Sequence, residues 1–165
     1  KVSFKEDTSE NLVKHLDQAK IDFAIFAFPY ELPDFIESFQ VFADPIYFIQ
    51  HKNRKSKVID NGSLLMLEQG HCLRSHILQN NKISTKHISN FSCTSISTLV
   101  AMVDTNIGVS FLPRMAIDFG ILSHYPNINI DLESTKAKRD IGVIYRKNNP
   151  QEENIKKLAT LLKAD

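Results

Sequence analysis

The sequence predicts an α/β protein with two lobes and a cleft between them, and three observations support this class. Apolar runs typical of buried strands alternate with segments that carry apolar residues at helical spacing. This alternation occurs twice, before and after a polar, lysine-rich stretch at 52–62. Of the 165 residues, 42% are hydrophobic, which is enough for one core or for two small, closely joined ones.

The first lobe is predicted to begin with a strand, a helix and a second strand. A short strand is expected at 2–4, and the polar side chains at 7–9 offer N-cap oxygens to a helix with an apolar face over 12–19. The run IDFAIFAF at 21–28 is apolar throughout, which is typical of a strand covered on both faces of a largely parallel sheet. More strand is expected within 39–52.

After residue 62 the chain repeats this order and ends in a helix. Thr94 and Ser95 are capping candidates, and the amphipathic pattern at the C-terminus predicts a helix packed onto a sheet. The predicted elements are strands at 63–68, 87–92, 109–113 and 140–146 and helices at 73–79, 96–103 and 151–163.

These elements suggest a domain organisation. We expect residues 1–51 to form the N-terminal part of lobe I and 52–62 to be a linker or crossover. Residues 63–113 should form lobe II, and 114–165 should return and complete lobe I with the C-terminal helix. Ligands of such sheets bind outside the carboxyl ends of the strands, where Cys72 is expected to lie.

Charge and composition exclude several classes of function. Lys and Arg number 20 against 19 Asp and Glu and are mostly scattered, so this piece has no basic footprint for nucleic acid. The chain has no run of about 18 apolar residues and no apolar signal core, so no membrane association or export is expected. Two cysteines are too few for a secreted disulfide framework, which favours a reducing cytoplasm. Because the chain begins with Lys, we expect a processed protein or an excised fragment.

One cysteine stands in a context that favours reactivity. In EQGHCLRSH, Gly70 allows a sharp turn out of the preceding strand, so that Cys72 should lie at the start of a helix. Arg74 adds a positive charge, and His71 can donate or accept a proton. A thiol reacts as its thiolate, which helix N-termini and cations favour, and a thiolate attacks peroxide to give a sulfenic acid. The sequence equally allows Cys72 to be a small buried apolar residue.

A metal site is a weaker interpretation of the same stretch. Cys72 and His76 are four residues apart, which suits two ligands on one helix. A tetrahedral site needs further ligands, and the sequence has no evident partner pair. We therefore expect no metal and no cofactor.

Four stretches of the sequence resemble one known family. LLMLEQGHCLRSH resembles the regulatory domain of OxyR-type proteins, the peroxide-sensing members of the LysR-type transcriptional regulators, in which a strand precedes L-E-x-G-H-C-L-R. CTSISTLVAMVDTNIGVSFLP, RDIGVIYRKNNP and LVKHLDQAKIDFAIFAF also resemble family segments, although Ala19 replaces the usual glycine in the last. The resemblance covers nearly the whole chain, and the cysteine motif is its most specific part.

The resemblance implies roles for individual residues. Cys72 would be the peroxide-reactive cysteine, His71 its neighbour in the pocket, and Arg146 the strand arginine near that pocket. Ser9 would stand where the family has a pocket threonine. The implied fold is periplasmic-binding-protein-like, and the resemblance implies that its first strand and helix are missing here. A homodimer or tetramer would form through this domain, and DNA would bind only through an N-terminal domain absent from this chain.

The second cysteine of the family motif is missing here. The family's resolving cysteine lies nine residues after the reactive one, a position held by Asn81. Either Cys72 works alone, resting as a sulfenic acid or as a mixed disulfide with a small thiol, or Cys93 resolves it. A third alternative is that the sequence is an engineered variant. Cys93 is also interpretable as a small buried residue, in which case it has no redox role.

The leading hypothesis is a sensor domain of a transcription regulator, not an enzyme. Hydrogen peroxide would oxidise Cys72, reorganise the segment 72–84 and change the arrangement of subunits on DNA. The second hypothesis is a non-redox domain that binds a small anionic metabolite through Arg74, Arg146, Thr94 and Ser95. A thiol peroxidase that turns over is a third alternative and would need a regenerating reductant.

Overall fold

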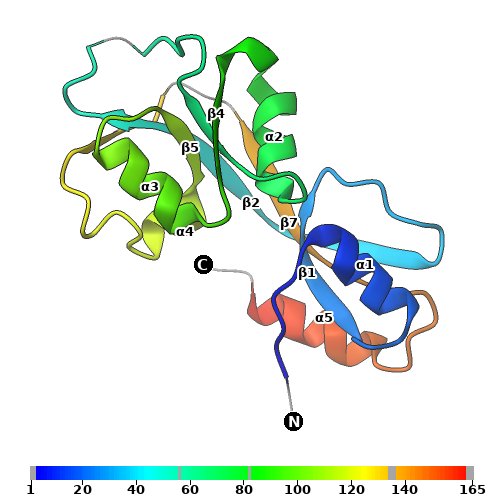
Figure 1. The fold of residues 1–165 in the computed structure, drawn as a ribbon. Coiled ribbons are helices and arrows are strands. Elements are labelled where there is room, and N and C mark those ends of the chain that lie inside the picture. The colour runs from blue at the N-terminus through cyan, green and yellow to red at the C-terminus, as the bar shows by residue number, and fades with distance from the viewer. Residues whose placement is uncertain (1–2, 56, 82, 134–136, 163–165) are drawn as a thin grey trace. The chain divides into compact units, whose positions relative to one another are not determined.

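The computed structural model describes residues 3–55, 57–81, 83–133 and 137–162. The chain divides into two compact units. The first comprises the described residues up to Ala43, the short segment Gly70–Cys72 and the described residues from Arg139 onward; the second comprises Asp44–Gln69 and Leu73–Lys138. The strands and helices confirm the predicted α/β class, and Figure 1 shows their order along the chain.

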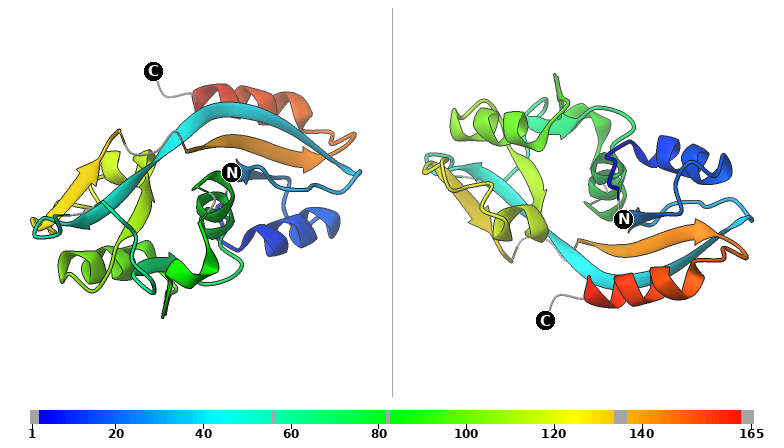
Figure 2. Two further views of the ribbon diagram at one scale, coloured as in Figure 1. Left: turned by 90° about the horizontal axis from the view of Figure 1, so that it is seen from above. Right: turned by 90° about the horizontal axis from the view of Figure 1, so that it is seen from below.

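The first unit is a small sheet with a helix on each face. Strand β7 lies between β1 and β2, and it pairs with β1 in antiparallel fashion, with Phe23 opposite Tyr145. Helices α1 and α5 cover opposite faces of these strands (Figure 2). The elements are α1 (Ser9–Asp17), β1 (Phe23–Phe28), the first part of β2 (Ile36–His51), β7 (Lys138–Arg146) and α5 (Glu152–Leu161).

Alternation along β7 divides the apolar residues between two small cores. Ile144 points to the α1 side, where it packs with the fully buried Leu16. Val143 and Tyr145 point to the α5 side, where they pack with Ile155 and Ala159. Each face of these strands therefore packs against one helix, α1 on one side and α5 on the other.

Two predictions about this unit are wrong. The run at 21–28 was expected in a largely parallel sheet, but β1 pairs antiparallel with β7. An apolar run reports burial on both faces, which α1 and α5 provide here, and carries no information on strand direction. The strand expected at 2–4 is absent at Ser3 and Phe4, and residue 2 lies outside the described residues. Phe4 is 80% exposed, so its side chain is not packed as a residue of a buried strand would be.

The second unit contains the repeated strand–helix order that the sequence predicts. Strands β3 and β4 pair in parallel, with Leu67 opposite Cys93, and α2 connects them. A parallel bridge from Leu64 to Val109 continues this arrangement. The elements are β3 (Leu64–Leu67), α2 (Cys72–Asn81), the 3-10 turn η1 (Thr85–His87), β4 (Ile88–Cys93), α3 (Ile96–Asp104), β5 (Ser110–Pro113), α4 (Arg114–Asp118) and β6 (Ile128–Asp131).

The second part of β2 supports this unit from within. It pairs antiparallel with β5, Phe48 opposite Phe111, and with β6, Ile49 opposite Ile130. One apolar core joins these strands with β3, α2 and α3. Leu73 and Ile77 are the buried anchors of α2 in that core, 4% and 3% exposed.

The boundaries of the compact units differ from the boundaries expected for the lobes. The first unit ends within β2 at Ala43, earlier than the expected 51, because the second part of that strand pairs with β5 and β6. The chain returns to it at Arg139, within β7, later than the expected 114. The described residues of 52–62 contain no helix or strand and lie within the second unit. The division into lobes stays a prediction.

Candidate functional site

Cys72 is the first residue of α2. Strand β3 ends at Leu67, and Gly70 has a φ of +98°, a left-handed conformation that glycine adopts without strain. The predicted order of strand, glycine turn and helix start is thus confirmed. The thiol is free and partly exposed, and the first turn of α2 contains no acidic residue. The N–H groups of this turn have no carbonyl partners within the helix, so they favour negative charge beside the cysteine.

The two basic neighbours of Cys72 have different environments. His71 lies in the turn directly before the helix and is partly buried. Arg74 is turned back onto the preceding strand, where its Nη1 donates to the Leu67 carbonyl at 3.0 Å. Arg74 therefore ties the first turn of α2 to the end of β3.

Cys93 is a core residue. It ends β4 opposite Leu67 and is 3% exposed. Its Sγ lies 3.4 Å from the thioether sulfur of Met102. Burial, and to a smaller extent the carboxylate of Glu68, raises the pKa of the Cys93 thiol. Cys93 thus has the environment of a small apolar residue, one of the two interpretations that the sequence left open.

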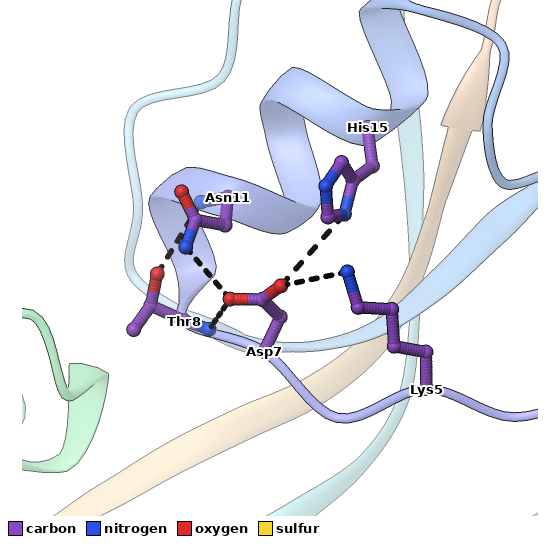
Figure 3. A network of polar contacts seen from close by, with 5 residues as sticks. All are labelled: Lys5, Asp7, Thr8, Asn11 and His15. Atoms are coloured by element: carbon purple, nitrogen blue, oxygen red, sulfur yellow. Dashed lines mark hydrogen bonds and ion pairs between the residues drawn. The ribbon is translucent and has the colours of Figure 1, made fainter.

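The start of α1, where Ser9 lies, is fixed by a network around Asp7 (Figure 3). One carboxylate oxygen accepts from the Thr8 backbone N–H at 2.9 Å and from the Asn11 amide at 2.7 Å. The other lies 3.1 Å from the Lys5 ammonium and 3.9 Å from Nδ1 of His15. Thr8 is the N-cap, since its hydroxyl accepts from the Asn11 N–H at 3.4 Å. Ser9 is the first helical residue and is partly exposed.

The cysteine turn belongs to the same compact unit as this helix start. Gly70–Cys72 groups with α1 and Arg146 and not with the rest of α2. A Cβ placed on Gly70 would lie 3.9 Å from the methyl group of Thr8, an ordinary van der Waals distance. Cys72, His71 and Ser9, which the sequence singled out separately, are therefore parts of one unit.

The network around Asp7 leads to a prediction about acid stability. Its hydrogen bonds, chiefly that from Asn11 and next that from Lys5, lower the pKa of Asp7 from 3.8 to about 2. A carboxylate with a lowered pKa adds stability above its unfolded-state pKa and loses it as the pH falls toward the folded value. We expect Asp7→Asn to lower the melting temperature at neutral pH, with the difference from wild type shrinking between about pH 4 and pH 2.

Thermal unfolding followed by circular dichroism at several pH values checks this prediction. The matched control is Asp17→Asn, which removes a carboxylate from the other end of α1 without removing a hydrogen bond seen in the described chain. The control should change the melting temperature at neutral pH less than Asp7→Asn. A difference for Asp7→Asn that persists undiminished at pH 2 would contradict the role of its charge.

Arg146 lies at the other end of α1. Its Nη1 donates to the Leu16 carbonyl at 2.5 Å and to the Ile21 carbonyl at 3.3 Å. The Leu16 carbonyl is about 10 Å along the helix axis from Ser9. These bonds make Arg146 a clamp that holds the C-terminal end of α1 and the following turn onto β7. The described contacts do not join its guanidinium to Cys72.

The candidate anion-binding hydroxyls lie at the start of α3. Ser95 is its N-cap, as predicted, and its Oγ accepts from the Thr98 N–H at 3.2 Å. The same Oγ lies 3.0 Å from the Thr98 hydroxyl. Thr94 and Ser95 are exposed. The capping bond thus already occupies part of the hydrogen-bonding capacity of Ser95.

Sequence reasoning missed the central position of Asp7. It treated Asp7 only as one of three capping candidates. The available signal was the spacing of Asp7, Asn11 and His15, which places their side chains along one side of the helix start. Among the described residues, no group of three or more His, Cys, Asp or Glu could hold a metal ion. Nor does the described part of the chain contain a helix long and apolar enough to cross a bilayer.

The family profile described as LysR substrate binding domain matches residues 1–165. The chain belongs to this family. The LysR substrate-binding domain has a periplasmic-binding-protein-like α/β fold, in agreement with the fold expected from the sequence. The match takes up the whole chain, so none of its residues form a DNA-binding domain.

The curated relatives are transcription regulators. The HTH-type transcriptional regulator EstR of Acinetobacter baylyi is 27% identical over 96% of this chain and 55% of its own length. The DNA-binding transcriptional dual regulator OxyR of Escherichia coli is 28% identical over 96% of this chain and 54% of its own. The hydrogen peroxide-inducible genes activator of Haemophilus influenzae is 28% identical over 94% of this chain and 54% of its own length. This LysR-type chain therefore spans about half the length of the curated relatives it matches.

Solved structures of OxyR regulatory domains have the same fold. The reduced form of the regulatory domain of OxyR2 from Vibrio vulnificus superposes with a TM-score of 0.89 at 31% identity and covers 96% of this chain and 78% of that one. The reduced OxyR regulatory domain from Pseudomonas aeruginosa has a TM-score of 0.80 at 24% identity and supports the fold alone. The LysR-type chain is thus OxyR-like in fold and in sequence.

Proposed function

We propose that this chain is the regulatory domain of a peroxide-sensing LysR-type transcription regulator and that hydrogen peroxide oxidises Cys72. The observation that supports this most directly is the partly exposed thiol at the first residue of α2, after a turn that Gly70 makes possible. Relatives named for hydrogen peroxide induction and OxyR structures of the same fold also support it. Because peroxide is small and uncharged, a partly exposed thiol is accessible enough to react with it.

The proposed reaction is a two-electron oxidation of the thiolate. The Cys72 sulfur attacks one peroxide oxygen, the O–O bond breaks, and a sulfenic acid forms on the sulfur. The second oxygen leaves as hydroxide and becomes water with one proton. We assign His71 as the neighbouring proton donor and Ser9, at the start of α1, as the hydroxyl that orients the peroxide. Arg146 acts indirectly as a positioning residue, because it holds the other end of α1.

The proposed relay runs through α2. This helix begins with the oxidised residue and has Leu73 and Ile77 as its buried anchors, so a new group on Cys72 disturbs their packing. The change would alter how copies of the domain associate as dimers or tetramers. DNA would be bound by an N-terminal domain that is not part of this chain, and the regulator would act in the cytoplasm.

One relative favours a second candidate function. EstR, 27% identical to this chain, is not named for peroxide. The alternative is a domain that binds a small anionic metabolite, with Arg74, Thr94 and Ser95 of the second unit as donors. A metabolite that raises the melting temperature of a Cys72→Ser variant as much as that of wild type, together with no peroxide reaction, would favour this alternative.

Mass spectrometry of the thiol state tests the proposed function. The reduced chain is treated with less than one equivalent of hydrogen peroxide, and sulfenic acid is trapped with a selective reagent. We expect the trapped product on Cys72 only. Cys93→Ala should retain it, because Cys93 is a core residue, and Cys72→Ser should abolish it. A Cys72 that stays unmodified, or a product on Cys93, would contradict the proposal.

A further inference from the structure

The turn that leads into β3 contains the one asparagine of the chain that is followed by glycine, in the pair Asn61–Gly62. Every other asparagine precedes a larger residue. Asparagine is thermolabile because the backbone nitrogen of the next residue can attack its side-chain amide. A side chain on that next residue hinders the attack, and glycine has none. The sequence therefore makes Asn61 the most labile asparagine of the chain.

The structure leaves this pair accessible. Asn61 and Gly62 are both exposed, and a Cβ placed on Gly62 would meet nothing within 4 Å. Within the described parts of the chain, no residue forms a hydrogen bond with the Asn61 side chain. The Gly62 nitrogen and water can therefore both approach the amide carbon of Asn61 without displacing a packed neighbour.

One hydrogen bond restrains the attacking nitrogen. The Gly62 N–H donates to the Lys86 carbonyl of η1 at 3.0 Å. Ser63 closes the turn, because its N–H and its hydroxyl both donate to the Asp60 carbonyl, at 3.2 and 3.0 Å. The Gly62 nitrogen attacks without its proton, so its bond to Lys86 has to open first. A single hydrogen bond is worth about 1 kcal/mol, which slows the reaction about fivefold.

From these observations we infer that Asn61 is a site of spontaneous deamidation in the folded chain. The inference is independent of the proposed function. The Gly62 nitrogen forms a bond to Cγ of Asn61, the C–N bond of the side-chain amide breaks, and ammonia leaves with the proton that the backbone nitrogen gave up. A cyclic imide then joins the two residues. Water opens this ring at either carbonyl and gives aspartate or isoaspartate.

The two products differ in their effect on the turn. Aspartate adds a charge next to Asp60, whose side chain is 69% exposed and lies 3.7 Å from the Arg54 guanidinium. A charge in such an exposed place changes stability little. Isoaspartate also adds one carbon to the main chain before Gly62, so the N–H is displaced from the Lys86 carbonyl while Ser63 closes the turn. Isoaspartate therefore weakens the link between the start of β3 and η1.

Peptide mapping of the aged chain tests the inference. The folded full chain is kept at neutral pH below its melting temperature, and samples are digested and weighed over time. We expect the peptide with Asn61 to gain the mass of OH in place of NH2 before any other asparagine reacts, and an isoaspartyl methyltransferase should label the product. The rate should rise in proportion to hydroxide, because the deprotonated nitrogen is the nucleophile. The same chain unfolded in guanidinium chloride should react about fivefold faster.

Two variants serve as controls. Gly62→Ala places a methyl group beside the nitrogen and should slow deamidation in the unfolded chain, where the fold has no influence. Asn61→Asp carries the charge without the extra carbon and should melt like the wild type, whereas the isoaspartate fraction should melt at a lower temperature.

Three results would overturn the inference. The first is a folded chain that keeps Asn61 intact while the unfolded chain is fully converted. The second is deamidation of another asparagine before Asn61. The third is an equal rate for wild type and Gly62→Ala in the unfolded chain, since the Gly62 nitrogen would then not be the attacking group.

Discussion

Gly142→Ala is expected to destabilise the chain by about 3 kcal/mol, because a new methyl group in a packed sheet has no space. Gly142 lies in β7 between β1 and β2. A Cβ at this position would lie 2.5 Å from the carbonyl oxygen of Phe39 and 2.9 Å from the ring of Phe28. The carbonyl oxygen belongs to the neighbouring strand β2, so relieving the contact means moving backbone. Urea unfolding followed by circular dichroism measures the loss.

The matched control is Gly62→Ala. It adds the same methyl group where a Cβ meets nothing within 4 Å, although the φ of +70° is unfavourable for alanine. We expect Gly62→Ala to lower the free energy of unfolding by about 1 kcal/mol, which comes from the backbone conformation alone. If Gly142→Ala lowers the free energy of unfolding no more than Gly62→Ala does, then β2 does not approach β7 as closely at Gly142 as the structure shows.

Local patterns in the sequence predicted most of the strands and helices. The strand expected at 63–68 is β3, and the helix expected at 73–79 is α2, which extends a little further at both ends. The helix predicted after Thr94 and Ser95 begins where the Ser95 hydroxyl caps it. These predictions succeeded because apolar periodicity and capping are properties of consecutive residues.

Pairing between distant strands could not be predicted in the same way. The apolar run of β1 is explained by α1 and α5 on its two faces, and its antiparallel partner β7 comes more than a hundred residues later. Nothing within the run encodes the direction of that partner. The unit boundary within β2 has the same cause, because the strand changes partners along its length.

For the candidate site, the sequence predicted positions better than contacts. It placed Cys72 at a helix start and Ser9 near the start of α1, and both placements are confirmed. It left open whether Cys93 is buried, since burial depends on α3 and β3 closing around the strand end. It could not show that Arg146 is bonded to the far end of α1, because that contact joins residues 130 positions apart.

The second large effect concerns Arg146. Arg146→Met is expected to lower the stability of the chain by about 2 kcal/mol, because it removes charge-assisted hydrogen bonds to two backbone carbonyls. Methionine retains much of the apolar stem, so the loss reports mainly the guanidinium. The carbonyls of Leu16 and Ile21 then lack this donor, and the C-terminal end of α1 loosens. Arg114→Met is the control, because it removes only an exposed ion pair to Asp118, worth about 0.4 kcal/mol.

The same variant separates two roles for this arginine. Denaturant unfolding gives the stability loss, and the rate of Cys72 oxidation is measured at a temperature where the variant remains folded. A clamp at the end of α1 acts on Ser9 only through the helix, so stability and oxidation rate should change together. Arg146→Lys keeps one hydrogen-bond donor and should therefore recover part of the stability and part of the oxidation rate. If Arg146→Met leaves stability unchanged yet slows oxidation, the arginine acts directly at the thiol. The bonds to Leu16 and Ile21 then do not describe its function, and the positioning role must be abandoned.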